Sequence, residues 1–187
     1  MGFFLGRRGI FQPLMISLSV LIFSSMVGYE FPLSFTLSTL FATIFSSSNT
    51  VRAFWEDMAI NRVILRYGKE GGFFLPYALT VTVSFIVNLS TLLLSFLIYN
   101  FFGFREVFGV LVWTFSSCAL SVIISIIGEM ARVNLEFFSA VLLIPILLGI
   151  YGFLSSENPW TFFVLMLLMG LFYLSFAYLI SDFLFEV

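Results

Sequence analysis

Six apolar runs of membrane-spanning length follow one another along this chain and leave little room for any other fold. A helix needs about 20 residues to cross the roughly 30 Å hydrocarbon core of a bilayer. The chain is 61% hydrophobic and 10% charged, whereas soluble domains are about 45–50% apolar and about 25% charged. The sequence therefore predicts an all-α, polytopic integral membrane protein that forms one domain over residues 1–187. The six predicted spans occupy residues 10–29, 31–50, 73–102, 107–128, 135–154 and 160–180.

The cationic side chains are divided unevenly between the two sides that these spans define. Seven of the 8 Lys and Arg residues precede the first run or lie between the second and third or the fourth and fifth runs. Lys and Arg near span ends favour the cytoplasm, so the asymmetry predicts an even number of spans with both termini cytoplasmic. The seven are Arg7, Arg8, Arg52, Arg62, Arg66, Lys69 and Arg132, and the exception is Arg105.

The segment 52–68 interrupts the apolar pattern between the second and third runs. On a helical wheel, Arg62, Arg66 and Lys69 share one stripe, and apolar residues cluster on another face. This pattern predicts a short helix in the cytoplasmic membrane interface, with Trp55 at the depth of the lipid headgroups. A basic loop helix bound to anionic membrane lipid is the alternative. The apolar face holds Phe54, Met58 and Leu65.

Several glycines and prolines predict departures from straight helices. A flexible joint is expected over residues 68–72, just before the third run. That run, 73–102, would form a helix of about 45 Å, so we expect it to tilt, project from the membrane or begin with an interfacial turn near Pro76. Pro145 predicts a kink within the fifth run. Pro159 is well placed to open the sixth helix.

Two polar residues are expected inside the membrane. Asn88 lies near the middle of the third run and should face another helix, because an unpaired amide in lipid costs several kcal/mol. Glu136 falls just inside the fifth run, and an ionisable residue at membrane depth suggests a functional role. We favour instead a structural pair with Arg132, four residues earlier on the same helical face. The other acidic residues fall near span ends, where water can reach them.

The composition argues against several classes of function. The chain has no histidine, which removes the commonest metal ligand and general base, so neither a metal site nor a catalytic residue is predicted. It has no glycine-rich phosphate loop and should not hydrolyse ATP by itself. No run carries a polar stripe long enough to line a pore, so a channel is poorly supported. No charged tail suggests nucleic acid, and the lone Cys118 is expected to be a packing residue.

The segment Arg52-Ala53-Phe54-Trp55-Glu56-Asp57 is similar to the Arg-x-Phe-x-acid-Asp stretch of the cytochrome c maturation B family, the heme exporter permease of the type 2 ABC exporters. The resemblance continues in the spacing to Phe101-Phe102-Gly103 and in the Leu/Pro-rich residues 142–148. Asn61 stands where the family has a glycine, and asparagine can also adopt a left-handed backbone. The resemblance extends over most of the chain.

This resemblance implies a permease subunit of the cell inner membrane that is driven by a separate ABC ATPase. ATP would bind to that ATPase, and heme would belong to the complex, with no cofactor assigned to this chain. The implied partners are heme-handling C and small D membrane subunits, a heme chaperone and a second copy of the chain. The residues implied to couple to the ATPase are Arg52, Phe54, Trp55, Glu56, Asp57, Asn61, Arg62 and Arg66.

Two other functions remain open on the sequence. The chain could be the permease for another exported substrate, such as a lipid, a polysaccharide or a drug. It could also be a scaffold subunit that anchors partners in the membrane and transports nothing.

Overall fold

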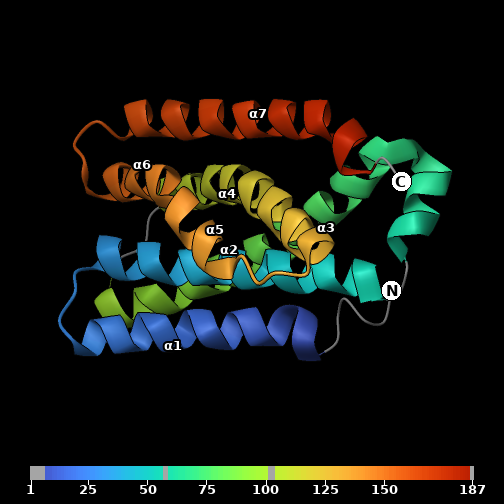
Figure 1. The fold of residues 1–187 in the computed structure, drawn as a ribbon. Coiled ribbons are helices and arrows are strands. Elements are labelled where there is room, and N and C mark those ends of the chain that lie inside the picture. Colours follow the sequence, from blue (N-terminus) through green and yellow to red (C-terminus); the bar gives the residue numbers. More distant parts are fainter. Residues whose placement is uncertain (1–6, 57–58, 101–103, 186–187) are drawn as a thin grey trace.

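A computed structural model describes residues 7–56, 59–100 and 104–185, and every element in these ranges is a helix, as predicted (Figure 1). The helices run back and forth between two ends of a bundle, and the start of the first helix and the end of the last lie at the same end. The elements are η1 (Arg7–Phe11), α1 (Gln12–Met26), α2 (Phe31–Glu56), α3 (Ala59–Tyr99), α4 (Phe104–Ala131), α5 (Glu136–Leu142), α6 (Ile144–Ser155) and α7 (Pro159–Leu184).

Four helical stretches in the described ranges are long and apolar enough to cross a membrane: η1 with α1, α3, α4 and α7. A fifth crossing results if α5 and α6 form one span, although the two helices are bent by 52°. The bend lies at Leu143, and Pro145 sits in the first turn of α6, where its missing N–H does no harm. The kink predicted at Pro145 is therefore confirmed, and Pro159 opens α7 as expected.

Helix α2 is long enough to span a bilayer but is too polar to be recognised by its composition. Its 26 residues extend about 39 Å. The helix that contains the predicted second span, 31–50, thus continues to Glu56, but its composition does not identify it as a span. The polar side chains of α2 point into the bundle and not toward lipid, since nearly all of them are buried. The buried polar residues of this helix are Ser34, Thr36, Ser38, Thr39, Thr43, Ser46, Ser47, Ser48 and Thr50.

Hydroxyl groups from neighbouring helices pair with those of α2. Ser17 of α1 hydrogen-bonds both Ser38 of α2 at 2.7 Å and Thr91 of α3 at 2.8 Å. The Ser38 hydroxyl also lies 2.6 Å from the backbone oxygen of Ser17 and donates to it. Farther along α2, Ser47 hydrogen-bonds Ser121 of α4. In a bilayer such bonds are needed because lipid offers polar groups no partner.

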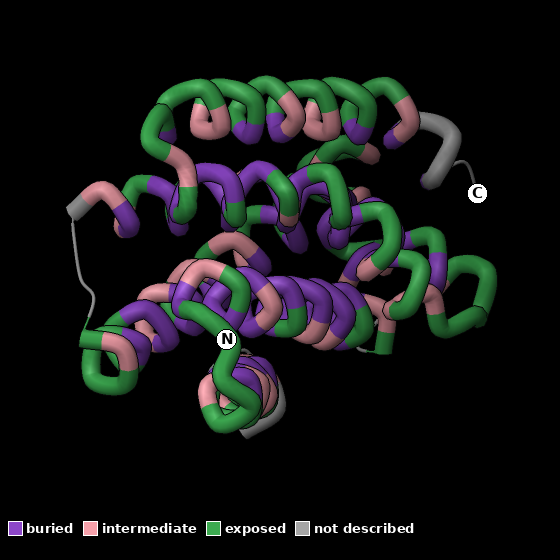
Figure 2. Tube along the Cα trace, turned by 90° about the vertical axis from the view of Figure 1, so that its left-hand side faces the viewer, coloured by how far each residue is buried: buried purple, intermediate pink, exposed green. Residues whose placement is uncertain are grey.

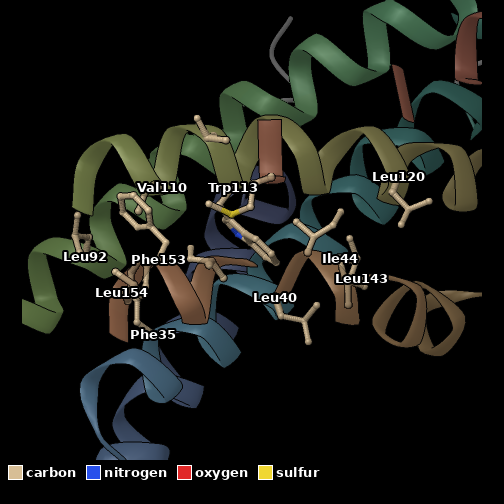
Figure 3. Packing of buried hydrophobic residues seen from close by; sticks show 14 of the residues in the cluster. Phe35, Leu40, Ile44, Leu92, Val110, Trp113, Leu120, Leu143, Phe153 and Leu154 are labelled. Atoms are coloured by element: carbon tan, nitrogen blue, oxygen red, sulfur yellow. The ribbon is translucent and has the colours of Figure 1, made fainter. Parts of the chain in front are cut away.

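An apolar core fills the space on the other side of α2. In Figure 3 the indole ring of Trp113 extends from α4 into a cluster with Phe35 and Ile44 of α2 and Phe153 of α6. Trp113, Phe35 and Phe153 are completely buried. Figure 2 shows buried residues in the interior of the bundle and exposed ones outside. Many exposed residues are large and apolar, as expected of a surface that faces lipid.

Helices α4 and α7 approach each other closely at Gly170. A β-carbon added there would lie 2.6 Å from Ser116 Oγ and 3.0 Å from Ser116 Cα, so no larger residue fits without moving a helix. The Ser116 hydroxyl donates to the backbone oxygen of Met166 at 2.6 Å, across the same contact. Small residues at helix contacts allow this approach in membranes.

Replacing Gly170 with leucine should therefore destabilise the protein. We expect a loss of about 1–3 kcal/mol, measured as a lower unfolding temperature in detergent, because α4 and α7 must separate. Ser175→Leu is the matched control: Ser175 lies on an exposed face of the same helix, so this change should have little effect. Equal unfolding temperatures for the two variants would contradict the close approach.

Candidate functional site

The predicted coupling segment is divided between two helices. Residues 52–56 form the last turn of α2, and Ala59–Tyr67 forms a short first limb of α3. Gly68 separates this limb from the long part of α3 with φ of 76° and ψ of 177°. A single helix over 52–68 is therefore not confirmed: residues 52–56 belong to α2, whose buried face continues through Phe54, and residues 57–58 lie outside the described residues. The break in α3 lies at Gly68, and none lies near Pro76, which is inside the helix.

The residues of this segment differ in how far they reach the surface. Phe54 is buried within the bundle. Trp55 is half-buried, with its ring centroid 6.4 Å from that of Phe185 near the C-terminus. Asp57 lies outside the described residues. The exposed members are Arg52, Glu56, Asn61, Arg62 and Arg66, so five of the eight predicted coupling residues are available at the surface.

Two of the basic residues in the predicted coupling segment, Arg52 and Arg66, make contacts with neighbouring side chains. Arg52 Nε lies 3.3 Å from Glu129 Oε1, an ion pair that joins α2 to the end of α4. The Arg66 guanidinium lies over the ring of Tyr67, 5.3 Å from its centroid. The first limb of α3 thus presents basic side chains beside an exposed apolar residue, Leu65, which is 87% exposed.

Glu136 opens α5 and is only partly buried. Its Oε1 accepts a hydrogen bond from the Ser48 hydroxyl of α2 at 2.8 Å. The expected pair with Arg132 was wrong, since α4 ends at Ala131 and Arg132 lies in the turn with φ of 54°. The two residues therefore do not share a helical face, and the partner of Glu136 is a hydroxyl.

A groove runs along the C-terminal end of α2, between the start of α1 and the start of α5. Its volume is about 230 Å³, below the roughly 300–1,000 Å³ of sites for drug-sized ligands. A second cavity of about 30 Å³ adjoins it and shares Arg52 and Glu136. The groove suits a small polar molecule or water. It is lined by Gly9, Gln12, Phe45, Asn49, Thr50, Arg52, Ala53, Glu56, Val83 and Glu136.

The groove offers charged and amide groups that can bind a small polar ligand. Within the described ranges, no group of three or more His, Cys, Asp and Glu side chains could hold a metal ion. The charged groups of the groove are Arg52, Glu56 and Glu136, and Arg52 is already paired with Glu129.

Asn88 lies at the centre of the bundle and is completely buried. Its amide nitrogen donates to Thr114 Oγ1 of α4 at 3.0 Å, which confirms that this residue faces another helix. Asn88 also belongs to a buried polar stripe on α3, whose members are spaced by four, four, three and four residues. The stripe consists of Thr80, Ser84, Asn88, Thr91 and Ser95.

This stripe was overlooked in the sequence. It is buried between helices, so the expectation that no run carries a polar stripe long enough to line a pore stays a prediction. The signal was present in the sequence, because residues at such spacings share one face of a helix. A similar spacing of small residues, Ser34-x3-Ser38-x3-Ala42-x3-Ser46, marks α2 as a packing helix.

Glu106 is a buried carboxylate that the sequence reading overlooked. It is 3% exposed, in the first turn of α4. Oε1 lies 3.4 Å from Arg105 Nε, whereas Oε2 has no hydrogen-bond partner among the described residues. The expectation that water reaches the acidic residues other than Glu136 was wrong here, because α4 begins three residues earlier than the predicted span.

Comparisons with protein-family models, with curated proteins and with solved structures found no match.

The bend at Gly68 can be tested by removing its conformational freedom. A left-handed backbone costs an L-residue about 1–2 kcal/mol, so Gly68→Ala should reorient the first limb of α3. Spin labels on Asn61→Cys and Val133→Cys, in a Cys118→Ser background, should report a shifted distance by pulsed electron resonance.

Gly28→Ala provides the matched control for this measurement. Gly28 also has positive φ, 89°, and neither glycine has an atom within 4 Å of an added β-carbon. Both variants place an L side chain at positive φ, but Gly28 lies in the turn between α1 and α2. Unchanged distances in Gly68→Ala, or equal shifts in both variants, would contradict the claim that Gly68 determines the orientation of the first limb of α3.

Proposed function

We propose that this chain is a six-pass permease subunit of an ABC exporter, with both termini in the cytoplasm and a separate ATPase at the inner end. The six crossings are α1, α2, the long part of α3, α4, α5 with α6, and α7. In this proposal α2 is a crossing despite its polarity, because the surrounding helices shield its hydroxyls from lipid.

The observation that carries the proposal is the first limb of α3. It is short, basic and exposed, and Gly68 sets it apart from the long part of the helix. It lies at the end of the bundle that also holds the start of η1 and the end of α7 (Figure 1). A partner protein can bind such a limb. A movement of the limb would then shift α2, which precedes it in the chain, and the long part of α3, which follows Gly68.

The mechanism would be mechanical. Closure of the ATPase subunits on ATP would push the limb, and the push would reach the bundle at two places. One is the end of α2, which the Arg52–Glu129 ion pair joins to α4. The other is the start of the long part of α3, where Gly72 packs against Phe185 near the C-terminus. Coupling of this kind needs an element with two discrete arrangements, and a left-handed glycine is a natural hinge.

Within this class, we propose kinship with the cytochrome c maturation B family on the resemblance of residues 52–57. Its partners would be the ATPase, the C and D membrane subunits, the heme chaperone and a second copy of the chain. Heme would be handled by these partners. The chain has no histidine, and the groove is smaller than the sites of drug-sized ligands.

A second candidate is a permease for another exported substrate. The buried polar stripe on α3 supports it, because hydroxyl and amide groups inside the bundle can hydrogen-bond a polar substrate other than heme. The ATPase and its docking end would be the same in both cases.

A photo-crosslinking amino acid at Leu65 tests the docking end. In cells, we expect it to capture an ABC ATPase subunit, identified by mass spectrometry. Reversing the neighbouring charges, with Arg62→Glu and Arg66→Glu together, should lower this yield and the rate of ATP hydrolysis by the purified complex by about tenfold or more.

The control carries the same crosslinker at Trp160, which is 60% exposed at the opposite end, and should capture no ATPase. Failure to capture an ATPase at Leu65 would overturn the proposal. Capture combined with unchanged ATP hydrolysis after charge reversal would indicate the scaffold subunit instead.

A further inference from the structure

The face of α3 that carries Thr80, Ser84 and Asn88 packs against α4. Two hydrogen bonds fix this contact: Asn88 donates to Thr114, and the Tyr77 hydroxyl donates to the backbone oxygen of Phe115 at 3.1 Å. All three polar residues are completely buried. Their side chains are therefore held between helices, where neither lipid nor bulk water reaches them.

Four polar atoms at this place have no hydrogen-bond partner among the described residues. They are Thr80 Oγ1, Ser84 Oγ, Asn88 Oδ1 and, on α2, Ser46 Oγ. Each buried polar atom left unpaired costs about 1–3 kcal/mol. In folded proteins such atoms nearly always have a partner, and buried water is the usual one when the protein offers none.

The register of α2 and α3 brings Ser46 to the level of this stripe. The hydrogen bonds that Ser17 makes to both helices set Ser38 beside Thr91. One turn along α2, Ala42 packs in one cluster with Val83 and Val87. The two helices are antiparallel, so the next turn of α2 brings Ser46 to the level of Thr80 and Ser84. We call these four residues, Ser46, Thr80, Ser84 and Asn88, the polar seam.

The groove at the inner end of α2 reaches the beginning of this seam. Its lining includes Thr50, one helical turn from Ser46, and Val83, the neighbour of Ser84 in the chain. The groove also carries carboxylate and amide groups, which favour water. Polar residues of the groove and of the seam thus follow one another along α2, from Thr50 to Ser46.

We propose that the polar seam is a binding site for water, entered from the groove, and that it forms a hydrated crevice between α2, α3 and α4. Water there accepts from and donates to the hydroxyls of Ser46, Thr80 and Ser84 and donates to Asn88 Oδ1. The site is neutral, so it takes water and small hydrophilic molecules in preference to multivalent ions. It does not depend on the ATPase or on the cargo.

The chain contains its own reporter for this crevice. Cys118, its single cysteine, is completely buried on α4 and packs in one cluster with Tyr77 of α3, which lies about one helical turn from Thr80. A small hydrophilic thiol reagent that enters the seam from the groove therefore meets Cys118.

The first experiment measures the modification of native Cys118 in the full-length protein in lipid nanodiscs. The probe is the cationic reagent methanethiosulfonate ethylammonium, which leaves a mixed disulfide and releases methanesulfinate. We expect Cys118 to react about tenfold faster than a cysteine at Ala119 in a Cys118→Ser background. Ala119 is equally buried and follows Cys118 in α4, so its side chain is turned by about 100° around the helix from that of Cys118. Equal rates at the two positions would overturn the proposal.

The second experiment replaces Thr80 with valine, which has the same shape and no hydroxyl. In a hydrated seam this change removes a partner of the water, so the unfolding temperature should fall and the modification of Cys118 should slow severalfold. In a dry seam it removes an unpaired group and should raise the unfolding temperature. Thr82→Val is the control, because Thr82 is exposed and bonds within its own helix. A raised unfolding temperature for Thr80→Val beyond that of the control would overturn the proposal.

Discussion

The structure depends on keeping the hydroxyl groups of α2 away from lipid. A polar group in the hydrocarbon core has no water to bind, so the protein itself must satisfy it. Helix α2 meets this requirement by lying inside the bundle. Ser17 of α1 hydrogen-bonds both Ser38 of α2 and Thr91 of α3, and Ser121 of α4 hydrogen-bonds Ser47 of α2. These bonds join α1 and α4 directly to α2 and join α3 to α1 at the same place.

The remaining helices show the consequences of this arrangement. Helix α7 has a largely exposed, apolar surface suited to lipid, whereas α4 is mostly buried and contacts both the polar and the apolar sides of the core. Small side chains let the helices approach, as at Gly170, where α7 meets Ser116. Hydroxyl groups serve two purposes here, since they are small enough for close packing and polar enough to join helices.

Local features of the sequence predicted local features of the structure. The known effects of proline on helices predicted the kink at Pro145 and the start of α7 at Pro159. The cost of leaving an amide unpaired in lipid predicted that Asn88 contacts another helix. The failures concern residues whose state depends on distant partners. Glu136 bonds Ser48, 88 positions away, and no local pattern predicts that choice. The extension of α2 to Glu56 was not predicted, because the end of this helix is polar in sequence. Burial against other helices compensates for that polarity, and burial depends on the tertiary structure.

The central claim is that α2 crosses the membrane inside a shell of apolar helices, and the sidedness of its two ends tests this claim most directly. Single cysteines at Glu30 and Asn61, which flank α2, would be labelled in a Cys118→Ser background with a membrane-impermeant maleimide. We predict that residue 30 is labelled in intact cells and residue 61 only after permeabilisation. Labelling of both residues from the same side would contradict the claim, because α2 could then not be a membrane span.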